Sequence, residues 1–211
     1  KLPLIAQIKH LALPDELNKF GTFTYSGKYT GFITDFVAFG TLNSDLGDIQ
    51  TDIGFKKINE QSFEFKGQVE SPGFDLGEIT QTEELLGKVV LNMEMNGVKT
   101  KDELVADIIG IVHSIEAVGY NYKDVSIRGQ LKNERFNGFI EIVDPNLELE
   151  FSGLFDFTEE IPLFNFSAIV ENARLDELNI YKADSLPTVS FTMQTNFIGS
   201  DIDDFKGDIY L

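Results

Sequence analysis

Side chains that could do chemistry are sparse in this sequence and do not form a catalytic constellation. The two histidines, His10 and His113, lie far apart, and neither has metal-ligand spacing or a nucleophilic Ser motif beside it. The chain contains no cysteine, which excludes thiolate metal sites and thiol nucleophiles. We therefore expect no catalytic residue and no cofactor. We place His113 among Ile109, Ile111 and Ile115 on the inward face of a strand.

Carboxylates are the most abundant reactive groups, and some are adjacent in sequence, as in Glu83-Glu84 and Glu159-Glu160. Neighbours in a strand point to opposite faces, so adjacency does not create an acid–base pair. The run Asp201-Ile202-Asp203-Asp204 is similar to part of a calcium loop but lacks the full ligand spacing. We expect solvated carboxylates and no metal site.

The charge balance excludes two classes of partner. With 17 basic and 35 acidic residues the net charge is −18. Nucleic-acid phosphates require clustered Lys and Arg, and an anionic membrane surface repels such a chain. No stretch approaches 18 consecutive apolar residues, so we expect no helix that spans a bilayer. The plain interpretation is an acidic, solvated exterior.

The elements that must position any site are predicted to be strands, because apolar and polar residues alternate with period two. Phe63, Phe65 and Val69 share one face of a strand, and Glu64 and Lys66 lie on the other. The same alternation recurs at 89–97, 125–131, 147–155, 164–170, 189–193 and 205–209. The segment 104–118 also fits a helical stripe, but its many β-branched residues favour a strand. Single helical turns are expected at 14–17, 82–86 and 175–178.

Glycines recur at strand-length intervals. Gly27, Gly40, Gly54 and Gly67 are separated by 13, 14 and 13 residues, which is the step of one strand and one short turn. Strand glycines mark bends or close backbone approach, so we expect the sheet to curve. About a dozen strands with almost no helix leave one apolar face to be covered. Either two sheets face each other as a sandwich, or one sheet folds so that this face lines a trough, and alternation alone does not distinguish them.

Several different short motifs follow one another along the chain. The most extended begins at Phe32-Ile33-Thr34-Asp35-Phe36 and continues through Gly40 to Asp45-Leu46-Gly47. The others are Phe74-Asp75-Leu76-Gly77, Gly119-Tyr120-Asn121-Tyr122, Phe136-Asn137-Gly138, Asp144-Pro145-Asn146-Leu147, Phe151-Ser152-Gly153 and Asp203-Asp204-Phe205-Lys206-Gly207. In order and number these motifs resemble the TamB-like translocation and assembly module family, of the AsmA-like group, and are most similar to its Bacteroidetes-type members.

This resemblance implies an all-β fold: a long, curved, taco-shaped or U-shaped antiparallel β-sheet groove with an apolar interior and very little helix. Members of the family are anchored in the inner membrane of diderm bacteria and span the periplasm. They are implicated in moving phospholipid between the inner and outer membranes and in outer-membrane protein assembly with an Omp85-type barrel. They belong with the bridge-like lipid-transfer proteins of eukaryotes. The resemblance thus implies a non-catalytic lipid conduit.

We treat residues 1–211 as a single β-groove unit and expect it to be a fragment of a longer envelope-spanning protein, because the chain starts without Met and stops inside a strand-like run. Phospholipid acyl chains are the expected ligand, the Omp85-type barrel is expected to contact regions outside this fragment, and unpaired edges favour edge-to-edge self-association. The alternative is a closed β-sandwich that binds protein or glycan. The residues expected to line the groove are Phe36, Ala38, Leu42, Phe63, Phe65, Val69, Val89, Leu91, Met93, Ile109, Ile111, Ile127, Leu149, Phe151, Phe164, Phe166, Phe191 and Met193. A one-residue error in strand phase would move a whole strand's set to the other face.

Overall fold

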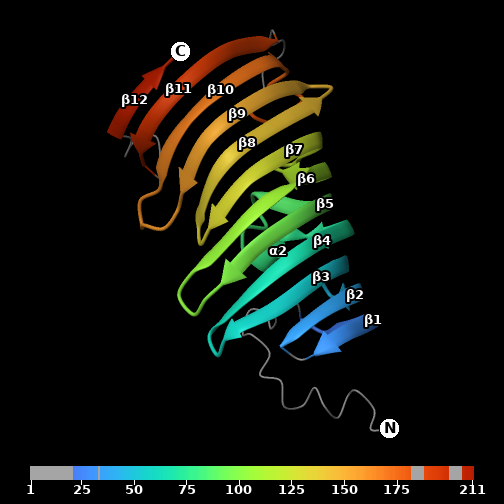
Figure 1. The fold of residues 1–211 in the computed structure, drawn as a ribbon. Coiled ribbons are helices and arrows are strands. Elements are labelled where there is room, and N and C mark those ends of the chain that lie inside the picture. The colour runs from blue at the N-terminus through green and yellow to red at the C-terminus, as the bar shows by residue number, and fades with distance from the viewer. Residues whose placement is uncertain (1–20, 33, 182–187, 200–205) are drawn as a thin grey trace.

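The chain forms one antiparallel β-sheet whose strands follow one another in sequence order (Figure 1). The structure is a computed structural model that describes residues 21–32, 34–181, 188–199 and 206–211. The twelve strands are β1 (Phe23–Phe32), β2 (Asp35–Ser44), β3 (Gly47–Asn59), β4 (Ser62–Asp75), β5 (Leu86–Lys99), β6 (Leu104–Ala117), β7 (Tyr120–Lys132), β8 (Arg135–Asp144), β9 (Leu147–Asp156), β10 (Leu163–Ala173), β11 (Val189–Ile198) and β12 (Lys206–Tyr210). Across the described ranges β1 and β12 do not pair, so the sheet is open. The predicted all-β antiparallel fold is confirmed, and the ambiguous segment 104–118 is the strand β6.

Short connections fix this topology, because an antiparallel pair needs only a tight turn. Val118 and Gly119 alone join β6 to β7, with φ of 51° and 73°, the two positive values that a type I′ hairpin turn requires. Two-residue connections also join β2 to β3, β7 to β8 and β8 to β9. Each strand therefore pairs with its sequence neighbours.

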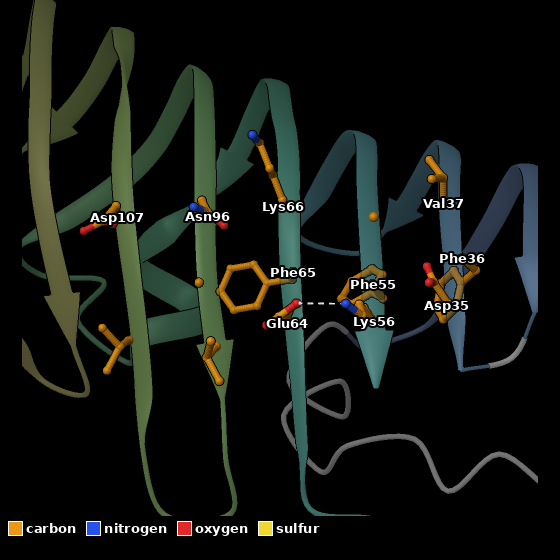
Figure 2. A pocket seen from close by; sticks show the side chains of 14 residues that line it. Asp35, Phe36, Val37, Phe55, Lys56, Glu64, Phe65, Lys66, Asn96 and Asp107 are labelled. Carbon is orange, nitrogen blue, oxygen red and sulfur yellow. Dashed lines mark ion pairs between the residues drawn. The ribbon is translucent and has the colours of Figure 1, made fainter. Parts of the chain in front are cut away.

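The two faces of the sheet differ in chemistry, and the register defines them, since directly opposed residues share a face. We call the face that carries Phe36, Phe55 and Phe65 the inner face and the opposite one, which carries Lys56 and Glu64, the outer face. In Figure 2 the strands curve away from the viewer, and Phe36 and Phe55 lie behind them. The sheet thus bends toward its apolar face.

Glycines on the inner face permit this bend. Gly129, Gly138 and Gly153 lie directly opposite one another on β7, β8 and β9. A Cβ atom added at Gly138 would lie 2.3 Å from the Arg128 carbonyl oxygen and 2.6 Å from the Cα atom of Gly129. The Phe136 ring lies over the same position, 2.8 Å from that hypothetical atom. An aromatic ring that covers a strand glycine replaces the packing that the missing side chain would have supplied.

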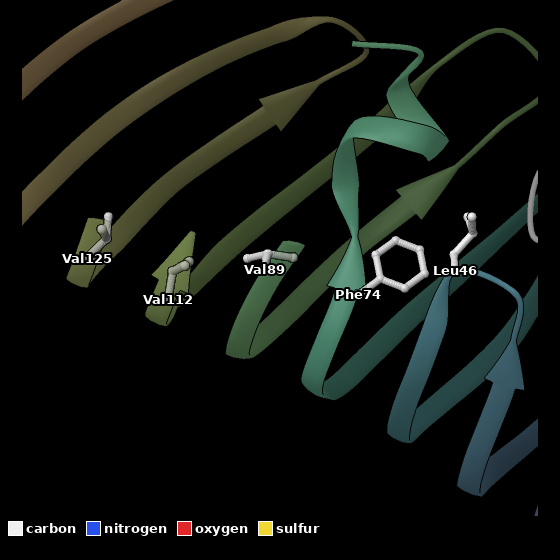
Figure 3. Close-up of a cluster of buried hydrophobic side chains, with 5 residues drawn as sticks. All are labelled: Leu46, Phe74, Val89, Val112 and Val125. Carbon is white, nitrogen blue, oxygen red and sulfur yellow. The ribbon is translucent and has the colours of Figure 1, made fainter. Parts of the chain in front are cut away.

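A short helix covers part of the inner face. α2 (Leu76–Thr80) begins at Asp75, whose carboxylate accepts a hydrogen bond from the Glu78 backbone N–H at 3.0 Å. Its residues Leu76 and Ile79 pack against a buried cluster formed by Leu46, Phe74, Val89, Val112 and Val125. Figure 3 shows four of these side chains on the adjacent strands β4 to β7 and Leu46 in the turn between β2 and β3, with α2 above Phe74.

The expected single turns at 82–86 and 175–178 are present, and a short helix that was not expected precedes the first of them. That helix lies at 76–80, where Asp75 supplies the cap, and the turn at 82–86, in which the Leu86 N–H donates to the Thr82 carbonyl at 2.8 Å, leads into β5. Residues 175–178 lie in a turn whose Leu178 N–H donates to the Arg174 carbonyl at 3.0 Å, without extending into a helix. The turn expected at 14–17 lies outside the described residues.

Hydrogen bonds to Asp156 connect the end of β9 to Arg135 on β8 and to Thr158. The Asp156 carboxylate accepts hydrogen bonds from the Thr158 hydroxyl at 2.6 Å and from Arg135 Nε at 2.7 Å. These two donors, the Thr158 hydroxyl first, lower the pKa of Asp156 from 3.8 to about 2. The ionised form is therefore favoured by folding.

This lowered pKa predicts a loss of stability in acid. The contribution is present above the pKa of the unfolded chain and is lost as the pH falls from about 4 toward 2, because protonation removes an acceptor. Urea unfolding of the wild type and of Asp156→Asn at pH 7, 4, 3 and 2 measures this. The difference in free energy of unfolding between the two proteins should shrink over that interval. A difference that stays constant with pH would contradict the assignment.

The glycine contacts predict a second stability effect. Gly138→Ala should lower the free energy of unfolding by roughly 2 kcal/mol, because the new methyl group overlaps the neighbouring backbone. Gly73→Ala is the matched control: no atom lies within 4 Å of its added Cβ, so its effect should stay within about 0.5 kcal/mol. Chemical denaturation of both variants measures the difference. Equal effects would show that close strand approach does not require glycine at position 138.

Candidate functional site

A row of aromatic side chains crosses the inner face perpendicular to the strands. Its members are directly opposed from strand to strand, and we call it the Phe row. From β2 to β11 it consists of Phe36, Phe55, Phe65, Gly97, Ala106, Leu131, Phe136, Phe155, Phe164 and Phe197. Phenylalanine thus occupies both ends of the row, and smaller side chains occupy its middle.

Ring contacts link the Phe row to its neighbours. The ring centroids of Phe36 and Phe55 are 5.2 Å apart, and Tyr29 extends this group at 4.7 Å from Phe36. In the other group Phe155 lies 5.7 Å from Phe164, which stacks on Phe197 at 4.9 Å. These distances are typical of favourable aromatic pairs. The rings form two clusters separated by β5, β6 and β7.

The Phe row is only half covered. All of its phenylalanines are partly exposed, and within the described ranges one sheet is present, with no second sheet facing it. The helix α2 lies against β5 on the other side of the glycine bend. An apolar strip therefore remains accessible along this half of the inner face.

The opposite half of the inner face is covered. Besides α2, the segment 174–181 folds over β7, β8 and β9, and its Leu178 is 0% exposed in a cluster with Leu147 and Ala173. Hydrogen bonds hold this segment: the Arg174 N–H donates to the Asn146 carbonyl at 2.9 Å, and Asn179 Nδ2 donates to the Gly119 carbonyl at 2.8 Å. Next to it, the buried Asp144 accepts from the Tyr120 hydroxyl at 2.6 Å and from the Asn146 backbone N–H at 2.9 Å. Burial, followed by the hydrogen bond to Asp144, raises the pKa of Tyr120. This half is a conventional core.

Most residues expected to line the groove lie on the inner face, but they divide between its halves. Phe36, Phe65 and Phe164 belong to the accessible Phe row, whereas Val89 is buried in the core beneath α2. The register also places on the inner face Ala38, Leu42, Phe63, Val69, Leu91, Met93, Ile127, Leu149, Phe151, Phe166, Phe191 and Met193. The phenylalanines of the Phe row that the expected set did not include are Phe55, Phe136, Phe155 and Phe197. The alignment of these residues in one row depends on how the strands pair, which alternation within a strand does not predict. Alternation at 147–155 did predict that Phe155 and Phe151 lie on the same face.

The expectation for Ile109 and Ile111 is wrong: both lie on the outer face, 57% and 46% exposed. His113 also lies there and not among inward isoleucines. The physical reason is that β6 is apolar on both faces, so its alternation cannot choose a phase. Pairing of Met93 with Gly110 sets that phase, and Ile108 and Gly110 face inward instead.

Metal-ligating side chains do not gather on either face of the described sheet. The structure, where it describes the chain, contains no cluster of three or more His, Cys, Asp or Glu side chains suited to a metal ion. The segment 201–204 lies outside the described residues. A depression of about 470 Å³ on the outer face of β2–β6 is lined by polar and apolar side chains alike, among them Val37, Val98 and Val105 as well as the Lys56–Glu64 ion pair at 4.0 Å (Figure 2). None of the helices in the described ranges has the length and apolar character needed to cross a bilayer.

The division of the inner face predicts unequal costs for one substitution. Leu178→Ala should lower the free energy of unfolding by about 3 kcal/mol, because it leaves a cavity in a sealed cluster. Leu131→Ala, in the half-exposed Phe row, should cost about 1 kcal/mol, since less area is withdrawn from water there. Denaturant titration of both variants tests this. A larger cost at Leu131 would show that the Phe row is itself sealed.

Comparisons with known proteins do not extend these observations. No family model, no curated protein and no solved structure matches this chain. The likeness to the TamB-like family therefore rests on the sequence motifs. Function has to be argued from the geometry of the inner face.

Proposed function

We propose that this chain is a non-catalytic, lipid-binding segment whose Phe row holds acyl chains. The observation that carries the proposal is the accessible apolar strip: aligned phenylalanines, each partly exposed, with no covering layer in the described part of the chain. A folded chain rarely leaves such a strip open unless something binds it. Binding of an acyl chain requires only dispersion contact and the exclusion of water.

The dimensions suit an extended hydrocarbon. Strands lie about 4.8 Å apart, so a row from β2 to β11 is roughly 43 Å long. Two tails cross a bilayer core of about 30 Å, so one tail reaches about 15 Å, and the row could hold tails end to end. Each methylene removed from water contributes about 0.8 kcal/mol. The gain is spread along the strip, which favours sliding over tight binding at one point.

The cellular role that we propose follows the family resemblance. The segment would form part of a protein that is anchored in the inner membrane, spans the periplasm and moves phospholipid between the inner and outer membranes, supporting outer-membrane protein assembly. An Omp85-type barrel would contact other regions of that protein. The acidic outer face, which favours water over anionic lipid, is consistent with an aqueous compartment.

The alternative, a closed β-sandwich that binds protein or glycan, needs a second sheet against the inner face. The described ranges contain one sheet only. We therefore favour the lipid conduit.

A charge placed in the Phe row tests the proposal. Phe55→Glu and Phe155→Glu should lower the amount of phospholipid that copurifies with the chain, or that it takes from labelled vesicles, by about tenfold or more, because a carboxylate in contact with a tail must lose its hydration. Both should stay folded, since the site is open to water. Mass spectrometry of organic extracts and a vesicle transfer assay provide the measurements.

Phe39→Glu is the matched control, because Phe39 lies on the outer face and is 60% exposed. It should bind lipid like the wild type. Wild-type chain without lipid, or equal loss in the control, would argue against the Phe row as the binding strip. Unfolding of both inner-face variants would favour a closed core.

A further inference from the structure

An apolar patch interrupts the polar outer face at β6–β8. Ile109 and Ile111 are neighbours on β6, and Phe139 lies two strands away in the same cross-strand row as Ile109. Their side chains are 57%, 46% and 50% exposed. We call these three residues the outer patch. Between them on β7, the Arg128 guanidinium lies 4.6 Å from the centre of the Phe139 ring.

The outer patch lies in a hollow and not on a ridge. A depression of about 810 Å³ is lined by all three of its side chains, together with His113, Arg128 and Ser126. This volume is in the range of sites that accept several side chains or a small ligand. The hollow opens on the face opposite to the Phe row, so its occupant is distinct from a lipid held there.

Carboxylates form the rim of the hollow. Glu94 lies directly opposite Ile109, and Glu141 lies directly opposite Glu150 on the next strand. Two like charges in one cross-strand pair repel each other. None of the three carboxylates forms an ion pair with any part of the chain that the structure describes. Arg128 is the one Lys or Arg among the residues that line the hollow, and its guanidinium lies over the Phe139 ring, so the three carboxylates leave the lining with a net negative charge. An apolar centre with this acidic rim is complementary to an apolar side chain flanked by Lys or Arg.

We propose that the outer patch binds a polypeptide segment of a partner protein in which apolar residues alternate with basic ones. Two other occupants fit the charges less well. A second copy of this chain, related by a two-fold axis, would bring identical acidic rims together, at a net charge of −18 per copy. An anionic lipid surface would be repelled by the same carboxylates.

The test uses the 211-residue chain and a seven-residue synthetic peptide of alternating Lys and Leu, with calorimetry or fluorescence anisotropy as the readout. The double variant Ile111→Thr/Phe139→Ser should weaken binding by about tenfold, because it removes the apolar centre. Glu141→Gln/Glu150→Gln should also weaken binding and reduce its dependence on salt. Circular dichroism and thermal unfolding verify that each variant stays folded.

Matched controls lie at exposed positions away from the hollow. Ile58→Thr/Phe39→Ser makes the same chemical changes at positions that are 52% and 60% exposed, outside the hollow and its rim, and should bind the peptide like the wild type. A peptide of alternating Lys and Ser should bind at least about tenfold more weakly, since it lacks apolar side chains.

Four results would overturn the proposal. Equal binding of the Lys/Ser peptide would reduce the site to general charge attraction. Equal loss in the control double variant would exclude the hollow. Loss of peptide binding in Phe55→Glu with none in Ile111→Thr/Phe139→Ser would place the peptide on the inner face. Sedimentation that shows concentration-dependent self-association, abolished by Ile111→Thr/Phe139→Ser, would identify a second copy as the occupant instead.

Discussion

The architecture depends on one constraint: the apolar face of the sheet has to be withdrawn from water, and the described ranges contain no second sheet to cover it. Burial of apolar area is the main favourable term in folding, at about 25 cal/mol per Å². In most proteins a facing sheet or a layer of helices provides that burial. Here the sheet bends toward its own apolar face, and side chains on neighbouring strands cover one another. Burial obtained in this way is incomplete, and the Phe row is what remains accessible.

The bend connects particular residue types to that outcome. Where Gly129, Gly138 and Gly153 meet in register, adjacent backbones approach more closely than a Cβ would permit. The ring of Phe136 lies across this glycine position, so aromatic area covers the exposed backbone. The abundance of Phe and the abundance of Gly therefore have a common structural explanation. The glycines let the strands curve, and the rings restore the contacts that glycine forgoes.

Stability and accessibility are separated along the length of each strand. One half of the inner face is sealed by α2 and by the segment 174–181, where Leu178 and the Asp144 hydrogen bonds give it the character of a core. The other half carries the Phe row and stays partly open. If the whole apolar face were buried to stabilise the fold, no apolar surface would remain for a ligand. Burial in the covered half stabilises the sheet while the other half stays accessible, and the lipid proposal depends on this division.

The sequence by itself determined the element type, because period-two alternation is a local property of the chain. It predicted strands from about residue 63 onward, the strand at 104–118 and the near absence of helix. It also assigned most apolar residues to a common face. It failed where the local signal is symmetric: β6 is apolar on both faces, so Ile109 and Ile111 received the wrong phase. Only the pairing of Met93 with Gly110 decides it.

The alignment of the Phe row was likewise decided by the tertiary structure. Phe36, Phe55 and Phe155 are far apart in sequence, and no periodicity states that they oppose one another across a sheet. Register, the bend and the covering of one half by α2 are relations between segments, fixed by the cross-strand contacts that form when the chain folds. Alternation predicts which apolar residues share a face, whereas the assembled sheet determines which of them are buried.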